Sequence, residues 1–339
     1  MKFAGRPDLL LCRVLTVAAL AGAGSMLRPS PGAAQREGYV LVANQQAANA
    51  SLIDLRTDNM RLIDVGTGPH EAIISPSGAI GVVTVYGTQV PGNELAIIDI
   101  KTGTVTRKIS LGEYTRPHGA MFLPGDETRV VVTSEATRNI VLVNIAEGKV
   151  EGAIPTGAAL SHKVGVTKDG TRAFTSNMGA GGISEMDLKA KTLVRTIPVA
   201  PRVEGVAVTP DGSMVWAGSN TNGTVSIIET KTGTVATTLT GFTLPYRIAI
   251  SADGRIAIVC DPQGSKIHVA DVAQRKVIWT LDGLEAPRGV SIAPDGKTAF
   301  VTLAGIPAVG IVDLTTRTML RKIGVGASPD GVGFGPVPK

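Results

Sequence analysis

Cysteine and histidine are scarce in this chain, and their scarcity narrows the chemistry that it can carry. The 339 residues include two cysteines and four histidines. Cys12 lies in an N-terminal segment that we expect to be removed, so Cys260 alone remains and no internal disulfide can form. We expect Cys260 to be a buried thiol without a chemical role. No Cys-x-x-Cys-His motif occurs, so covalently attached haem is not expected.

Several familiar catalytic and nucleotide-binding motifs are also missing. The sequence has no Gly-x-Ser-x-Gly elbow and no His-Glu-x-x-His zinc motif. The stretch PDGKT around Lys297 imitates the end of a phosphate-binding loop, but Ser291 stands where the first glycine should be. We therefore interpret this stretch as a turn and predict no bound nucleotide.

Much of the net positive charge of the chain lies in its first 34 residues, which have the features of a secretory signal. Basic residues precede the apolar run VLTVAALAGAGSML, and small residues end the segment at Ala34. The run is short and broken by Gly and Ser, which disfavours a membrane span. We predict a signal peptide over 1–34, a mature domain over 35–339, and a periplasmic or secreted location.

Loss of this segment leaves a mature chain close to neutral. The segment has one negatively charged residue, Asp8, and four positively charged ones: Lys2, Arg6, Arg13 and Arg28. Its removal therefore takes a net charge of +3 from the total of +5. The remaining charge, near +2, gives little reason to expect a nucleic-acid partner. No other long apolar run occurs, so we expect a soluble monomer without a membrane span.

Glycine is abundant, with 41 residues, and one glycine-containing phrase recurs from end to end. Its copies are GPHEAIISPSG, RPHGAMFLPGD, LSHKVGVTKDG, RVEGVAVTPDG, LPYRIAISADG, APRGVSIAPDG and SPDGVGFGP. In each copy, the residue that aligns with the His of RPHG is called position X. Position X is occupied by His70, His118, His162, Glu204, Tyr246, Arg288 and Asp330. The successive spacings of 48, 44, 42, 42, 42 and 42 residues fit the blades of a β-propeller.

The segments between these phrases read as short strands. Each copy continues through apolar, β-branched runs bounded by Gly, Asp and Asn, without helical periodicity. YVLVAN, ASLIDL and MRLIDV near the start lack a first strand, while DGVGFG at the end is a first strand with nothing after it. We predict an all-β, seven-bladed β-propeller of four-stranded antiparallel blades, closed by one blade shared between the two ends.

The repeat VEGVAVTPDGSMVWAGSNTNGTVSIIETKTGTVATTL resembles that of the YVTN family of β-propellers, exported proteins related to surface-layer repeats. The resemblance extends over essentially all of residues 38–336 and implies the propeller fold and export. The family is named for the tetrapeptide YVTN, and the strand ends that align with it have other residues in this chain, such as VTSE, TSNM and VCDP. The fold alone leaves the function open, because propellers have many unrelated activities.

Position X should lie at one mouth of the central channel, because the innermost strand of each blade begins there. His70, His118 and His162 occupy it in three consecutive blades. Imidazoles with a carboxylate are common ligands of Zn, Cu and Fe. We therefore predict a transition-metal site made by these three histidines and Glu204. Asp330 and Glu71 are expected to accept a hydrogen bond from the second ring nitrogen of His70.

Two further sets of residues should lie near this mouth. Tyr246, Arg247 and Arg288 lie across the ring from the histidines and could hold an anionic group; alternatively, Arg288 pairs with Asp330 and Arg247 turns outward. The ends of the second strands add polar residues: Asn44, Tyr86, Ser134, Glu135, Asn177, Ser219 and Asp261. His268, on a third strand, is interpreted as structural.

Three functions are compatible with these residues. The first is a metal-binding protein, either a carrier or a metal-dependent enzyme acting on a small anion. The second is a non-catalytic periplasmic interaction module without metal. The third is a metal-free enzyme such as a lactonase, for which the sequence offers no nucleophile. Metal content separates the first from the other two.

Overall fold

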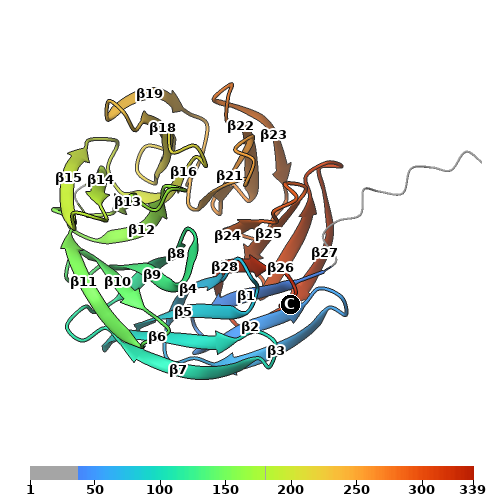
Figure 1. Ribbon diagram of the computed structural model, residues 1–339. Helices are drawn as coiled ribbons and strands as arrows, with labels where there is room; N and C mark the ends of the chain where they lie inside the picture. The colour runs from blue at the N-terminus through green and yellow to red at the C-terminus, as the bar shows by residue number, and fades with distance from the viewer. Residues whose placement is uncertain (1–36, 180) are drawn as a thin grey trace, which may run out of the picture.

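The computed structural model describes residues 37–179 and 181–339, and the regular elements of this part are all β-strands (Figure 1). They form seven four-stranded antiparallel sheets arranged in a ring. The predicted seven-bladed β-propeller is therefore confirmed. The predicted secretory segment, 1–34, lies outside the described residues. Within the described ranges there is no helix of the length and apolarity needed to cross a membrane.

The blades are numbered here from the first one that follows the shared blade. Blade 1 contains β4 (Pro69–Ile74), β5 (Ile80–Gly87), β6 (Pro91–Asp99) and β7 (Thr104–Ser110). Blade 2 contains β8 (Pro117–Leu123), β9 (Asp126–Ser134), β10 (Asn139–Asn144) and β11 (Lys149–Pro155). Blade 3 contains β12 (Ser161–Val166), β13 (Arg172–Asn177), β14 (Ile183–Asp187) and β15 (Thr192–Ile197). Blade 4 contains β16 (Val203–Val208), β17 (Met214–Ser219), β18 (Thr224–Glu229) and β19 (Thr234–Leu239). Blade 5 contains β20 (Ile248–Ile250), β21 (Ile256–Asp261), β22 (Lys266–Asp271) and β23 (Lys276–Asp282). Blade 6 contains β24 (Pro287–Ile292), β25 (Thr298–Leu303), β26 (Ala308–Asp313) and β27 (Thr318–Gly324).

Blade 7 closes the ring with strands from both ends of the described chain. Its order is β28 (Pro329–Gly335), β1 (Tyr39–Asn44), β2 (Asn49–Asp54) and β3 (Asn59–Asp64). The β1–β28 register runs from Tyr39 opposite Gly335 to Asn44 opposite Pro329. The predicted shared blade is confirmed, and this pairing joins the two ends by a ladder of main-chain hydrogen bonds.

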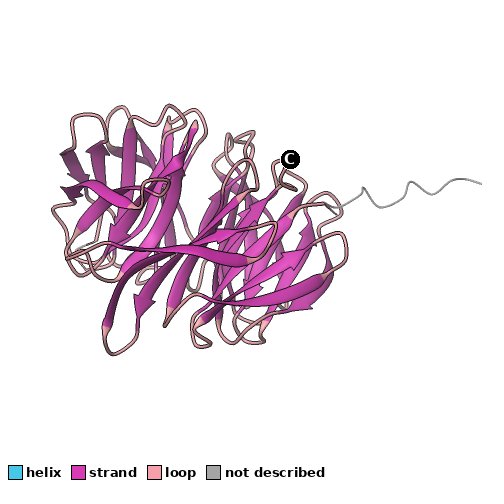
Figure 2. Cartoon of the chain, turned by 60° about the horizontal axis from the view of Figure 1, so that its bottom comes forward, coloured by secondary structure: helices cyan, strands magenta, loops and turns pink. Residues whose placement is uncertain are grey.

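Burial explains why inner and outer strands differ in sequence. All six residues of β25 are buried, because both of its faces pack against neighbouring blades. The outermost strand β23 instead alternates between exposed and half-buried residues. Apolar side chains fill the spaces between adjacent blades; Leu41 of blade 7, for example, shares a core cluster with Ile98 of blade 1. Figure 2 shows the twisted sheets of the ring in an oblique view.

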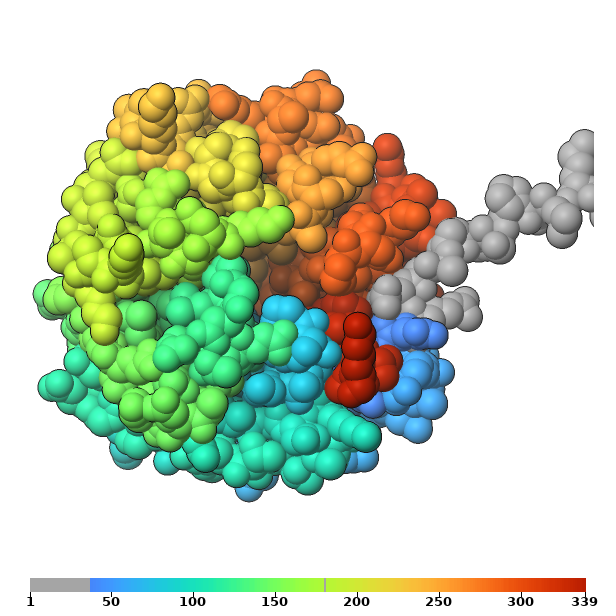
Figure 3. Space-filling model, in the orientation of Figure 1, coloured from blue at the N-terminus to red at the C-terminus, as the bar shows by residue number. Residues whose placement is uncertain are grey.

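The two faces of the ring are chemically different. The turns that end the innermost strands are held by short polar side chains; Asp211, for example, accepts hydrogen bonds from the Thr209 hydroxyl (2.5 Å) and the Ser213 N–H (3.0 Å). Pro336 lies against one of these turns, at Gly78. The face that carries the C-terminal residues is therefore this turn face, and Figure 3 shows it hollowed at the centre of the ring. The residues at position X lie toward the other face.

Hydroxyl side chains on second strands link neighbouring blades around the channel. Thr133 accepts a hydrogen bond from the Gly119 N–H (2.8 Å) of its own blade and donates one to the His162 carbonyl (2.7 Å) of the next blade. The same pair of contacts is made by Thr84, Ser176 and Thr302. The thiol of Cys260 has the equivalent place in blade 5, 3.8 Å from the Gly289 carbonyl. These bonds fix the backbone at the channel mouth.

Replacing Thr133 with valine should destabilise the protein without creating a cavity. Valine has nearly the same shape as threonine, but it would leave the buried Gly119 N–H and His162 carbonyl without this partner. We expect a loss of about 1–3 kcal/mol in the free energy of unfolding, measured by urea denaturation. Thr196→Val, at an exposed site on β15, is the matched control and should change little. Equal unfolding midpoints for both variants would mean that the Thr133 bonds do not stabilise the fold.

Candidate functional site

An irregularity in strand pairing directs position X toward the channel. In blade 1, Pro69 pairs with Val85 and Ala72 with Val83, so His70 and Glu71 lie in the interrupted stretch between them. Blades 2, 3, 4 and 6 show the same interruption at the start of the innermost strand. Bulges of this kind re-aim side chains locally. Successive X residues therefore converge although they are more than 40 residues apart in sequence.

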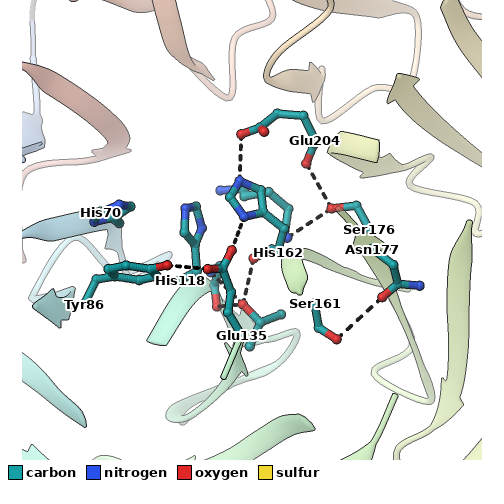
Figure 4. Close-up of polar contacts among 12 residues, drawn as sticks. His70, Tyr86, His118, Glu135, Ser161, His162, Ser176, Asn177 and Glu204 are labelled. Atoms are coloured by element: carbon teal, nitrogen blue, oxygen red, sulfur yellow. Dashed lines mark hydrogen bonds and ion pairs between the residues drawn. The ribbon is translucent and has the colours of Figure 1, made fainter. Parts of the chain in front are cut away.

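The three predicted histidines lie side by side at this mouth (Figure 4). The ring centroids of His70 and His118 are 4.9 Å apart, and those of His118 and His162 are 3.7 Å apart. Tyr86 stacks on His70 at 4.1 Å. The three histidines are between 2% and 9% exposed, so they form one largely buried cluster.

His162 is held between two carboxylates. Its Nδ1 pairs with Glu135, and its Nε2 lies 2.6 Å from Glu204 Oε1. Burial opposes the charged form of the ring, but the two carboxylates outweigh burial and raise the pKa of His162 to about 9. Burial likewise opposes ionisation of Glu204, yet His162 and Arg247 lower the pKa of Glu204 to about 2. Tyr86 donates a 2.5 Å hydrogen bond to the other oxygen of Glu135.

His70 and His118 have a different environment, in which burial lowers the pKa of both rings and favours their neutral forms. His70 Nδ1 lies 2.9 Å from the Gly68 carbonyl, which can only accept, so Nδ1 carries the proton. The Nε2 atom then has the lone pair, and it accepts a 2.8 Å hydrogen bond from Gln45 Nε2. The prediction that Asp330 and Glu71 accept a hydrogen bond from His70 is therefore wrong, because the Gly68 carbonyl takes the ring proton. His118 Nδ1 is buried and has no hydrogen-bond partner among the described residues.

Two groups of side chains in the described chain bring candidate metal-binding atoms within 4.8 Å of one another. One contains His70, His118 and Asp330, and the other contains His118, Glu135 and His162. His118 is common to both. The predicted ligand Glu204 is in neither group, while Asp330, predicted as a hydrogen-bond acceptor for His70, and Glu135 are each in one. The three histidines do not form a single group by this distance.

Charged residues that directly follow position X fill the channel from alternate blades. Glu71 of blade 1 and Lys163 of blade 3 form an ion pair, although 92 residues separate them in sequence. Arg247 of blade 5 donates to Glu204 Oε1 (2.9 Å) and approaches Asp330 Oδ1 (3.5 Å). The intervening blades 2, 4 and 6 have glycine here, as has blade 7; a Cβ on Gly289 would lie 2.1 Å from the Asp330 carbonyl. Neighbouring backbones therefore pack closely where these glycines stand.

The structure contradicts the second of the two arrangements expected for Tyr246, Arg247 and Arg288, the residues opposite the histidines. Arg247 does not turn outward, because it is 3% exposed and has two carboxylate partners, and Arg288 does not pair with Asp330. Arg288 Nη1 instead lies 3.4 Å from the Ser328 hydroxyl. Tyr246 is largely buried, with the Arg247 guanidinium 5.0 Å from its ring centroid. The three residues thus lie near the mouth, but Arg247 is already engaged by Glu204 and Asp330.

The remaining predictions concern structural residues. Cys260 is a buried free thiol, as expected. His268 is buried on β22, where its Nε2 lies 3.3 Å from Asp261 Oδ2. Asp261 also accepts the backbone N–H groups of Thr243 and Leu244, so this predicted mouth residue anchors a loop.

Sequence reasoning did not identify Gln45 and Arg116, which line a depression of about 530 Å3 beside His70 and Tyr86. One signal could have indicated this side of the mouth. The spacing from His70 to His118 is 48 residues, against 42 in the later blades, so blade 1 contains an insertion. Long insertions in a regular repeat frequently carry function.

No family model matches the sequence, and no curated protein matches it. Among solved structures, the chain is similar to a chain of Kuenenia stuttgartiensis hydrazine synthase, with 18% sequence identity and a TM-score of 0.71. The match covers 81% of this chain and 92% of that chain. At this identity the similarity concerns the β-propeller fold alone.

Proposed function

We propose that this chain is an exported propeller protein that binds one divalent transition-metal ion at the channel mouth, through His118 and its neighbours. The observation that carries the proposal is the Nδ1 atom of His118, which is buried and without a hydrogen-bond partner among the described residues. Such an atom is costly to bury unless something binds it. It belongs to the one residue shared by both groups of candidate ligands.

His70, His118 and Asp330 are the better ligand set of the two. Both ring nitrogens of His162 already contact carboxylates, so metal binding there would have to break one of these bonds. His70, in contrast, keeps its proton on Nδ1 because of the Gly68 carbonyl, and metal binding at Nε2 would displace only the neutral amide of Gln45. A carbonyl partner on the second nitrogen is the usual arrangement for a metal-binding histidine.

The charge of the buried cluster also supports a bound cation. Four carboxylates lie in it: Glu71, Glu135, Glu204 and Asp330. They face Lys163, Arg247 and His162, so the carboxylates outnumber the basic side chains even when all three of these are charged. A divalent ion among His70, His118 and Asp330 would supply positive charge where it is lacking.

Two imidazoles and one carboxylate suit Zn, Fe or Cu and leave further coordination positions for a small molecule. When bound, the metal would supply Lewis-acid chemistry toward an anionic ligand. Export, to the periplasm or out of the cell, rests on the predicted signal over 1–34. Membership of the YVTN family remains part of this proposal, supported by the repeat quoted above.

A metal-free interaction module is the second candidate. The observation in its favour is that Glu135, His162, Glu204 and Arg247 already form a connected network of hydrogen bonds without a ligand. In that case the cluster would stabilise the ring, and one face would bind a partner. Such a module should keep its partner after metal-ligand residues are replaced.

The choice between the two ligand sets can be tested with one pair of carboxylate variants. We expect Asp330→Asn to weaken Zn²⁺ and Co²⁺ binding by more than about tenfold, and Glu135→Gln to weaken it less, in titrations against a competing chelator. The reverse order would assign the metal to His118, Glu135 and His162. Wild-type protein that binds neither ion would contradict the proposed function.

A further inference from the structure

A depression beside His70 adjoins the proposed metal site through that histidine alone. It has a volume of about 530 Å3. Its lining joins three blades: Gln45 and Gln46 follow β1, Thr67 and His70 lie at the start of blade 1, Tyr86 belongs to β5, and Arg116 precedes β8. His70 is therefore shared between this depression and the proposed metal site.

The insertion in blade 1 borders this depression. Strands β5 and β6 have eight and nine residues, and Gly87 and Thr88 from the hairpin between them line the depression. Arg116 fixes the hairpin from blade 2, because its N–H donates to the Gly92 carbonyl (2.7 Å) and its Nη2 to the Thr88 carbonyl (2.9 Å). An inserted hairpin held in this way builds a wall that the other blades lack.

Arg116 supplies the positive charge of the depression. Its guanidinium lies 4.8 Å from the Tyr86 ring centroid. In the described ranges no carboxylate pairs with it within 4.0 Å, unlike Arg247 at the centre of the mouth. A guanidinium has five N–H donors in a planar fork that matches a carboxylate. Arg116 can therefore receive an anion without losing an existing ion pair.

We propose that this depression binds a small carboxylate, with its anionic group on Arg116 and its body between Gln45 and Tyr86 beside His70. The guanidinium fork of Arg116 can pair with one carboxylate group, and the amides of Gln45 and Gln46 and the Thr67 hydroxyl can donate hydrogen bonds to the other polar groups of the ligand. The role of the ligand as a partner of the metal rests on the proposed function, whereas its contact with Arg116 does not. This assignment places the anion site on the histidine side of the mouth.

The test is calorimetric titration of the full protein with succinate, with inorganic phosphate, and with succinamide as the uncharged analogue, before and after Zn²⁺ loading. Arg116→Gln is compared with Arg202→Gln. Arg202 is the matched control because it has the same place in blade 4 and the same left-handed backbone, with φ of 54° against 56° for Arg116. Its side chain is exposed and outside the depression.

We expect succinate to bind wild type and Arg202→Gln equally, and Arg116→Gln at least tenfold more weakly, while the two variants load Zn²⁺ alike. Equal succinate affinity in both variants, no succinate binding to wild type, or tighter binding of phosphate or succinamide would overturn the inference. Zn²⁺ loading of the same samples decides the proposed function separately. Arg116-dependent binding in protein that takes up no metal would support the carboxylate site alone.

Discussion

Replacing His118 with alanine should abolish metal binding at the proposed site. The imidazole of His118 is common to both candidate ligand sets, so no rearrangement between the sets can replace it. We expect Zn²⁺ affinity to fall by more than about 100-fold, beyond the effect of losing a residue that only supports a ligand. Competition with a chromophoric chelator measures this directly.

The control for this variant is His268→Gln. His268 is as buried as the three mouth histidines, at 6% exposure, but it lies on β22 beside Asp261. A glutamine there keeps a donor for that carboxylate, and metal affinity should stay at the wild-type value. If His118→Ala and His268→Gln bind Zn²⁺ equally well, His118 is not a ligand. Circular dichroism of both variants verifies that the sheet content is unchanged.

Replacing Lys163 with methionine should strongly destabilise the ring. The pair of Lys163 and Glu71 is buried in the channel, with 15% and 7% of the two side chains exposed. Without Lys163, the Glu71 carboxylate stays in a site of low dielectric constant with no ion-pair partner. Breaking a buried pair in this way costs about 3–5 kcal/mol in the free energy of unfolding. Urea denaturation of protein without metal measures the loss.

A double variant separates the cost of the unpaired charge from the cost of altered packing. In Lys163→Met with Glu71→Leu neither charge remains, and we expect stability to return to within about 1 kcal/mol of the wild type. Lys149→Met, which breaks an exposed pair with Glu147, should have no measurable effect. A double variant as unstable as Lys163→Met would show that packing, rather than charge, accounts for the loss.

The fold and the place of the site could be predicted because both follow from the repeat. A blade cannot bury its faces alone, so a period near 42 residues requires neighbouring blades and a closed ring. The same period assigns each X residue to one mouth. The adjacency of His70, His118 and His162 follows from three consecutive copies, and Figure 4 shows these rings together.

The pairing of charges inside the mouth could not be predicted from the period. Glu71 and Lys163 meet across the channel, between blades that are not neighbours, and Arg247 reaches both Glu204 and Asp330. These contacts depend on side-chain length and on which blades have glycine after position X. Glu204 was predicted as a metal ligand because it follows the three histidines at position X in the next blade. Its contacts with His162 and Arg247 depend on side-chain directions, which the repeat does not give.

Elemental mass spectrometry of the mature protein, purified without an affinity tag from the periplasm predicted for it, tests the proposed metal site most directly. We predict close to one transition-metal ion per wild-type chain, retained through gel filtration. A protein that is purified without metal and binds no Zn²⁺, Cu²⁺ or Fe²⁺ on titration would contradict the proposal of a metal site. The buried nitrogen of His118 would then need another partner.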